Sequence, residues 1–110
     1  MIKIYGIKNC DTVKKALNFL DNNDVSYEFI DFKKIPPSID LLLSWKAING
    51  DFPINPKGRI FKEIKDQYLA TTSDKKKAKL LSENTSAIKR PLIEFNNKII
   101  LGFSEEEYKV

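Results

Sequence analysis

Apolar and polar residues alternate at the start of the chain and then change to a helical spacing. Residues 2–6 alternate and stop at Gly6, which predicts a short strand. Residues 11–20 repeat their apolar positions every three or four residues, which predicts a helix capped by Asp11 or Thr12. Residues 27–32 predict a second strand. This strand–helix–strand order indicates two parallel strands joined by a right-handed connection.

The middle of the chain has helical patterns and no convincing strand. The Pro36–Pro37 pair breaks the chain after the second strand. The elements expected here are a helix capped by Ser38 and ending at Asn49–Gly50, a loop over 52–58, a helical piece at 61–68 and a helix capped by Ser73 over 74–82. We interpret this segment, about 36–85, as a helical insertion.

The end of the chain returns to strands. Residues 91–95 and 98–101 flank Asn96–Asn97, which predicts a hairpin with a two-residue turn. The segment Ser104–Glu107 is typical of a capping box that opens a short terminal helix. With 110 residues, we expect one α/β domain over residues 1–110. Its four-stranded mixed sheet with a helical insertion is a thioredoxin-like fold.

Composition indicates a soluble globular protein. The chain is 42% hydrophobic and 31% charged, and no apolar run approaches the ~18 residues of a membrane span. The first residues alternate like a strand and lack the pattern of a signal peptide. We therefore expect a cytoplasmic protein that binds no membrane.

The basic balance of the chain raises the question of nucleic-acid binding. Nineteen Lys and Arg against fifteen Asp and Glu give a net charge of +4. The densest basic group, Lys75–Lys77 with Lys79, lies in a helical pattern. A solvated helix face accounts for it more simply than a phosphate-binding stripe. We expect no nucleic-acid partner.

The smallest counts in the composition are the most informative for chemistry. One cysteine excludes an internal disulfide, a CxxC dithiol and a multi-cysteine metal site. The absence of histidine excludes Ser-His-Asp and Cys-His catalysis and removes the commonest zinc ligand. We expect no metal and no bound cofactor. Cys10 is the leading candidate for side-chain chemistry.

Cys10 follows a strand and precedes a helix, so two interpretations are open. Backbone N–H groups of about Thr12 and Val13 can point at its sulfur, and Lys8 adds a positive charge; both favour a reactive thiolate. Alternatively, Cys10 is a small buried hydrophobic residue. The polar neighbours Asn9 and Asp11 favour the reactive interpretation, although the charge of Asp11 would oppose the thiolate.

Arg90 and Pro91 precede the predicted hairpin. Pro91 can hold a cis peptide bond and leave neighbouring backbone groups free for an extended peptide or glutathione. It can equally do no more than end a preceding helix. Arg90 can bind an anion or lie at the surface, and its residue type alone favours the surface.

Four segments together resemble the arsenate reductase-like (ArsC/Spx) family, and the YffB-like branch most closely. They are Tyr5–Ala16, Asn55–Lys62, Ile88–Ile93 and Leu101–Phe103 followed by acidic residues. The resemblance implies a thioredoxin fold with a helical insertion. It also implies a nucleophilic cysteine at Cys10, an anion-contacting arginine at Arg90 and a cis proline at Pro91.

Two departures from the family pattern limit the expected activity. Arsenate reductases of this type use three arginines. Only Arg90 has a clear counterpart in this chain, and Lys57 or Arg59 is the candidate to substitute in the middle segment. Lysine lacks the planar fork of arginine. The Spx branch, which binds RNA polymerase, typically has a second cysteine three residues after the first, where this chain has Val13. These departures argue against arsenate reduction and against an internal dithiol switch.

We therefore predict a monothiol oxidoreductase in which an external thiol, such as glutathione as co-substrate, resolves the mixed disulfide on Cys10. The expected partners are a small thiol or disulfide and a protein redox partner. The alternative is a non-catalytic, Spx-like adaptor that binds RNA polymerase or another protein. The expected catalytic residues are Cys10, Lys8 and Arg90. The expected substrate-binding residues are Asn9, Thr12, Pro91, Lys57 and Arg59.

Overall fold

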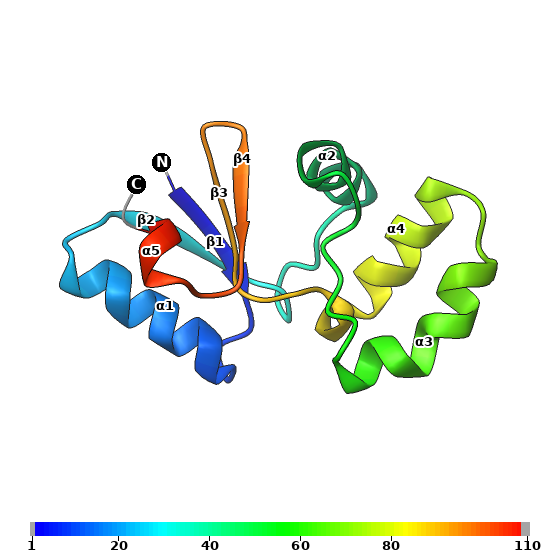
Figure 1. Cartoon of the computed structure of the whole chain (residues 1–110), viewed down its shortest axis with the longest axis horizontal. Helices are drawn as coiled ribbons and strands as arrows, with labels where there is room; N and C mark the ends of the chain where they lie inside the picture. Colours follow the sequence, from blue (N-terminus) through cyan, green and yellow to red (C-terminus); the bar gives the residue numbers. More distant parts are fainter. Residues whose placement is uncertain (1, 109–110) are drawn as a thin grey trace. The chain divides into compact units, whose positions relative to one another are not determined.

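The computed structural model describes residues 2–108 and divides the chain into two compact units. The sheet unit contains the chain up to Ile35 and from Arg90 onward, and the helical unit is Pro36–Lys89. The elements in chain order are β1 (Ile2–Gly6), α1 (Asp11–Asn22), β2 (Tyr27–Asp31), α2 (Ile39–Asn49), α3 (Arg59–Ala70), α4 (Asp74–Glu83), the 3-10 helix η1 (Thr85–Ala87), β3 (Leu92–Phe95), β4 (Lys98–Leu101) and α5 (Glu105–Tyr108) (Figure 1).

The four strands form one mixed sheet in the order β2-β1-β3-β4. β1 and β2 are parallel, whereas β3 is antiparallel to both β1 and β4. The hairpin turn is as predicted, because Asn96 and Asn97 have φ angles of 49° and 59°, the pair of positive values that a tight twisted hairpin requires. The sheet, the helix order and the strand directions confirm the thioredoxin-like fold.

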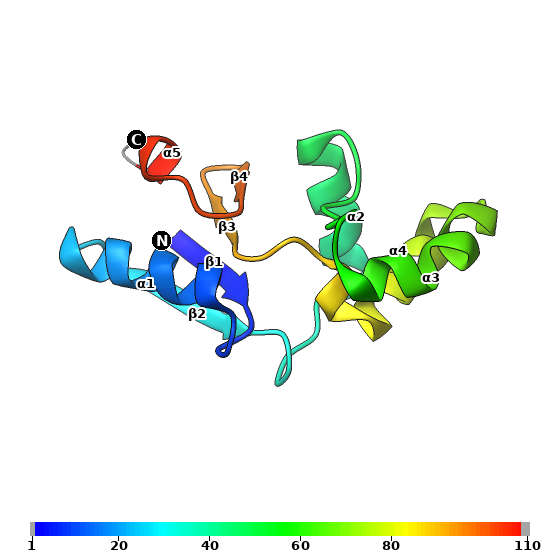
Figure 2. The ribbon, with the colours of Figure 1, turned by 60° about the horizontal axis from the view of Figure 1, so that its bottom comes forward.

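α1 and α5 lie on the same face of the sheet (Figure 1 and Figure 2). Ile4 and Ile93 from the strands and Ala16 and Leu20 from α1 form the buried cluster there. The ring of Phe19 in α1 contacts Phe103 and Tyr108 edge to face, with centroids 5.8 and 5.9 Å away. The helical spacing of α1 thus places its apolar face on the sheet, as the sequence predicts.

In the helical unit, serine side chains begin two helices. Ser38 accepts a hydrogen bond from the Leu41 N–H at 3.1 Å, and Ser73 accepts one from the Lys76 N–H at 3.4 Å, as predicted. In α2, Trp45 is fully buried, whereas the apolar side chain of Ile48 is 41% exposed. Ile48 lies two residues before Gly50, the left-handed residue (φ 91°) that caps the end of α2.

Most side chains of the lysine-rich run on α4 are exposed to solvent, as the sequence predicts. Lys75, Lys76 and Lys79 are exposed, whereas Ala78 between them is fully buried. Lys77 is half-buried, with its ammonium 4.9 Å from the ring centroid of Tyr68 in α3. The long lysine stem covers an aromatic ring while the charge remains near solvent.

Burial raises the pKa of Tyr68 from 10.0 to about 12, and the charges of Asp51 and Asp74 add to the effect. The folded state holds the proton of the Tyr68 hydroxyl more tightly than the unfolded state. The stability that this difference in pKa contributes is complete below pH 10 and is lost as the pH rises toward 12. We expect denaturant unfolding of Tyr68→Phe to show a smaller loss of stability over this interval than the parent protein. An equal loss in both would contradict this assignment.

Candidate functional site

Cys10 is held between a tight turn and the start of α1. Its N–H donates to the Ile7 carbonyl at 3.1 Å, so Lys8 and Asn9 form the exposed corner of a hydrogen-bonded turn. The Cys10 carbonyl accepts from the Lys14 N–H at 3.0 Å. Cys10 is half-buried, so it is not the fully buried hydrophobic residue of the alternative interpretation.

The residue that caps α1 is Cys10 itself, so the predicted cap at Asp11 or Thr12 is wrong. Cys10 has extended backbone angles (φ −94°, ψ 123°), and the helix begins at Asp11. Its side chain accepts no capping hydrogen bond, and the expected contact from the Thr12 and Val13 N–H groups to the sulfur is not made. Sulfur is a weak acceptor. The first turn of α1 therefore presents amide groups without a side-chain acceptor.

Gly6 allows α1 to approach the end of β1 closely. A Cβ atom at Gly6 would lie 2.8 Å from Cγ2 and 3.3 Å from Cγ1 of Val13. Val13 is fully buried in the first turn of α1. This contact fixes where the helix starts and hence where Cys10 lies. This contact could not be predicted from the sequence, because a glycine at the end of a strand is equally typical of a simple chain reversal.

The sheet topology brings Arg90 and Pro91 to the end of the sheet where Cys10 lies. β1 finishes where β3 begins, because Tyr5 pairs with Leu92 in the antiparallel register. β2 finishes there as well, since Gly6 pairs with Asp31. We call this the Cys10 end of the sheet, and the opposite end the far end. Figure 2 shows the chain leaving β1 and β2 at the same end.

The Arg90–Pro91 peptide bond is cis, which confirms that part of the prediction. Pro91 is fully buried, and its carbonyl accepts from the Gly102 N–H at 2.8 Å. The alternative, in which Pro91 ends a helix, is wrong, because Ile88 is extended and forms a β-bridge with Ile54. Gly102 adopts a φ of 79°, a conformation that glycine reaches without strain.

Arg90 is half-buried and incompletely paired. Its Nε atom is inaccessible to solvent and has no hydrogen-bond partner among residues 2–108. A buried donor without a partner costs roughly 1–3 kcal/mol. A carboxylate or another oxyanion can supply the missing acceptor through a bidentate contact with the guanidinium. This observation favours anion binding over the surface role that the residue type alone suggested.

A family model described as the ArsC family matches residues 5–110. The chain belongs to the ArsC family. A solved structure of a YffB protein is 32% identical, with a TM-score of 0.87, and the match covers 99% of this chain and 96% of that one. A possible arsenate reductase from Streptococcus mutans UA159 is 30% identical, with a TM-score of 0.81 and coverage of 100% and 98%. The global transcriptional regulator Spx of the same species is 26% identical over 99% of this chain and 81% of its own length.

In this ArsC-family chain, Lys57 and Arg59 belong to the helical unit. Lys57 is exposed in the loop before α3, and Arg59 begins that helix. The Arg59 Nη1 atom lies 2.7 Å from Oε1 of Glu63, and both side chains are exposed. Arg59 thus already has a carboxylate partner. A role for either residue in substrate binding stays a prediction, as do the roles of Asn9 and Thr12, both exposed.

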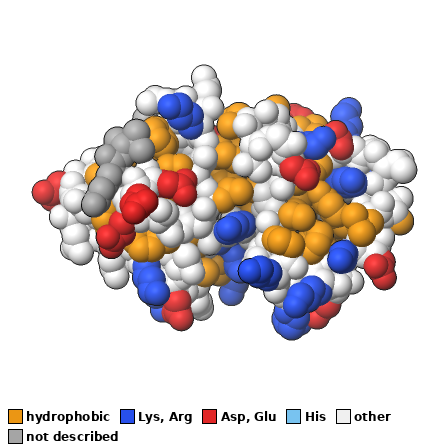
Figure 3. All heavy atoms as spheres, in the orientation of Figure 1, with side chains coloured by type: hydrophobic (Ala, Val, Ile, Leu, Met, Phe, Trp, Pro, Cys, Tyr) orange, Lys and Arg blue, Asp and Glu red, His pale blue; other side chains and the backbone are white. Residues whose placement is uncertain are grey.

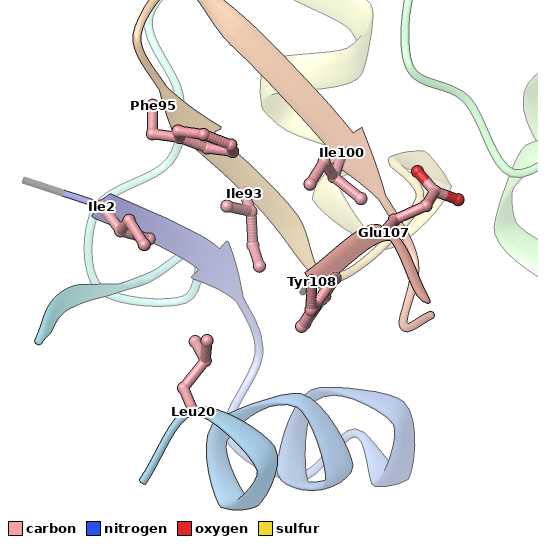
Figure 4. A pocket seen from close by; sticks show the side chains of 7 residues that line it. All are labelled: Ile2, Leu20, Ile93, Phe95, Ile100, Glu107 and Tyr108. Atoms are coloured by element: carbon pink, nitrogen blue, oxygen red, sulfur yellow. The ribbon is translucent and has the colours of Figure 1, made fainter. Parts of the chain in front are cut away.

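A small cavity of about 40 Å³ lies at the far end of the sheet, away from Cys10. Figure 4 shows its lining side chains, which come from the strands, α1 and α5: Ile2, Leu20, Ile93, Phe95, Ile100, Glu107 and Tyr108. Apolar side chains dominate the lining, and the volume suffices for little more than one or two water molecules. This cavity is therefore a packing gap beneath α5 rather than a substrate site.

Metal-ligand clusters and membrane-spanning helices are both absent from the part of the chain that the structure describes. Residues 2–108 contain no group of three or more His, Cys, Asp and Glu side chains placed to hold a metal ion. In the same range, no helix combines the length and the apolar character needed to cross a bilayer.

Proposed function

We propose that this ArsC-family chain is a monothiol oxidoreductase with Cys10 as its nucleophile. The observation that carries the proposal is the placement of a half-buried cysteine at the N-terminus of α1, at the same end of the sheet as an arginine with an unpaired Nε. The partial positive charge of the helix start and the charge of Lys8 both lie close to this cysteine in the chain. The thiolate is the form of cysteine that attacks disulfides.

The reaction takes two exchange steps. The Cys10 sulfur attacks one sulfur of a substrate disulfide; that S–S bond breaks, a new one forms to Cys10, and the other substrate sulfur leaves as a thiolate. An external thiolate such as glutathione then attacks the substrate sulfur of the mixed disulfide and releases the Cys10 thiolate. Because the chain has one cysteine, the second thiol has to come from outside. Arg90 holds a carboxylate of the substrate.

Arsenate reduction fits this chain less well. Arsenate reductases of this type place a further arginine near the end of the chain, where this chain has Leu101–Gly102–Phe103. Two of these three residues have structural roles. The Gly102 N–H donates to the Pro91 carbonyl, and the Phe103 ring contacts Phe19 and Tyr108. In the sheet unit this leaves Arg90 as the arginine available to an oxyanion. We therefore place a disulfide rather than arsenate in the role of substrate.

The test is mass spectrometry of the protein after incubation with glutathione disulfide. We expect one glutathionyl adduct on Cys10 that excess reduced glutathione removes. The absence of an adduct on Cys10 would overturn the proposal.

The second candidate function is an adaptor that binds RNA polymerase, with Cys10 dispensable. The match to Spx of Streptococcus mutans over 99% of this chain favours it. Capture of RNA polymerase subunits by the purified protein, unaffected by removal of the thiol, would support the adaptor. In this chain Val13 occupies the position of the second cysteine that Spx proteins typically carry. A disulfide switch within the chain is therefore no part of either candidate.

A further inference from the structure

A second turn lies beside the Cys10 turn and carries two lysines. After β2, the Lys34 and Ile35 N–H groups both donate to the Asp31 carbonyl, at 3.0 and 2.8 Å. Oδ1 of Asp31 accepts from the Lys33 N–H at 2.9 Å. The Asp31 carboxylate thus stabilises the turn through the backbone. Both lysine side chains are exposed, and neither forms an ion pair within residues 2–108.

The turn that carries these lysines is tied to the end of β1. The Phe32 N–H donates to the Gly6 carbonyl at 2.8 Å, which continues the parallel pairing of Gly6 with Asp31. The two chain segments therefore leave the sheet side by side, one toward Lys8 and Cys10 and the other toward Lys33 and Lys34. Arg90 precedes β3 at the same end of the sheet. Three separate segments of the chain therefore carry cations at the Cys10 end.

The far end of the sheet unit carries Lys3 and Lys98 but also most of the unit's carboxylates. Asp21 and Asp24 lie at the end of α1, and Asp21 accepts a hydrogen bond from the Tyr27 hydroxyl at the start of β2. α5 contributes three further carboxylates, Glu105–Glu107, and Figure 3 shows acidic side chains gathered over α5. Asp11 and Asp31 lie at the Cys10 end and Lys3 and Lys98 at the far end, but four cations, Lys8, Lys33, Lys34 and Arg90, gather at the Cys10 end.

We propose that Lys8, Lys33, Lys34 and Arg90 form a cationic rim that selects small disulfides bearing carboxylates as the substrates of Cys10. The inference rests on the proposed function and narrows its substrate class. Exposed cations that flank a reactive group raise the local concentration of anions and speed their encounter. The buried, unpaired Nε of Arg90 adds a fixed point for one carboxylate. A disulfide that carries ammonium groups gains neither effect and is repelled by the rim.

The test compares three disulfides of different charge at low ionic strength: dithiobis(nitrobenzoate), with two carboxylates, neutral dithiodipyridine and cystamine, with two ammonium groups. Each rate with Cys10 is divided by the rate of the same disulfide with mercaptoethanol, a neutral thiol, which removes intrinsic reactivity. We expect the normalised rate for the dicarboxylate to exceed that for cystamine by about tenfold. Since salt screens exposed charges, we expect this ratio to approach one near 1 M salt.

The double substitution Lys33→Gln with Lys34→Gln tests the rim directly. We expect it to lower the normalised rate for the dicarboxylate by about fivefold and to leave the neutral disulfide unchanged. The matched control is Lys3→Gln with Lys98→Gln, because both lysines are exposed and lie at the far end of the sheet. This control removes the same charge, and we expect it to retain the preference.

The outcomes separate this inference from the proposed function. Equal normalised rates for the dicarboxylate and cystamine would overturn the cationic rim and leave the thiol chemistry standing. An equal effect of the two double substitutions would also overturn it, because net charge alone would then explain the preference. A Cys10 that reacts with none of the three disulfides would contradict both proposals.

Discussion

Cys10→Ser is expected to abolish adduct formation with glutathione disulfide while making the protein more stable. The loss follows because a serine hydroxyl stays protonated at neutral pH and forms no bond of the disulfide type. The gain follows because Cys10 caps α1 without a side-chain hydrogen bond, and serine is among the preferred residues at that position. Denaturant unfolding should show an increase of about 0.5–1 kcal/mol in the free energy of unfolding.

The control for this prediction is Cys10→Ala. Alanine also removes the thiol, but its side chain cannot accept a hydrogen bond from the first turn of α1, so we expect no gain in stability. If Cys10→Ser is no more stable than Cys10→Ala, the inference that the first-turn amides lack an acceptor is wrong. Retention of RNA polymerase binding by Cys10→Ser, together with unreactive Cys10 in the parent protein, would favour the adaptor function.

Gly6→Ala is expected to destabilise the protein by about 2 kcal/mol and to slow the alkylation of Cys10 under conditions where the protein is folded. The new Cβ would meet Cγ2 of Val13 at 2.8 Å, and overpacking of this kind typically costs about 1–3 kcal/mol. The strain is relieved by moving the first turn of α1 away from β1, which displaces Cys10. Denaturant unfolding and iodoacetamide kinetics measure the two effects separately.

A double-mutant cycle ties this prediction to its cause. Val13→Ala removes both methyl groups that the new Cβ would meet, so Gly6→Ala should cost less in that background. Gly58→Ala is a matched control in the helical unit, because its Cβ would meet the side-chain Nδ2 of Asn55 at 2.9 Å, and a side-chain amide can move. An equal cost of Gly6→Ala in both backgrounds would show that the Val13 contact is not the cause.

Short sequence signals were sufficient to predict most of the helices, strands and turns of the fold. Ser38 and Ser73 mark the starts of two helices, and Asn96–Asn97 marks the hairpin turn, because each of these residue types satisfies a requirement set by its immediate neighbours. The strand–helix–strand order likewise determines the parallel pairing of β1 with β2. These features depend on short stretches of chain.

The contacts around the candidate site could not be predicted from the sequence. The sequence shows a glycine at position 6, at the end of the predicted strand. It does not show that the side chain of Val13 fills the space that a Cβ atom of residue 6 would occupy. The partner of the Pro91 carbonyl is the Gly102 N–H, and the missing partner of Arg90 Nε also depends on distant segments. The wrong cap at Asp11 or Thr12 has a different origin, because cysteine is not among the usual capping residues.

The chain contains one tryptophan and one cysteine, and the structure places one in each unit. Trp45 is fully buried in the helical unit, and Cys10 is half-buried in the sheet unit. Tryptophan fluorescence therefore reports the unfolding of one unit, and pulsed thiol labelling reports the unfolding of the other, without any engineered probe. Coincident transitions would show that the two units melt as a single cooperative system, and separated transitions would give the stability of each.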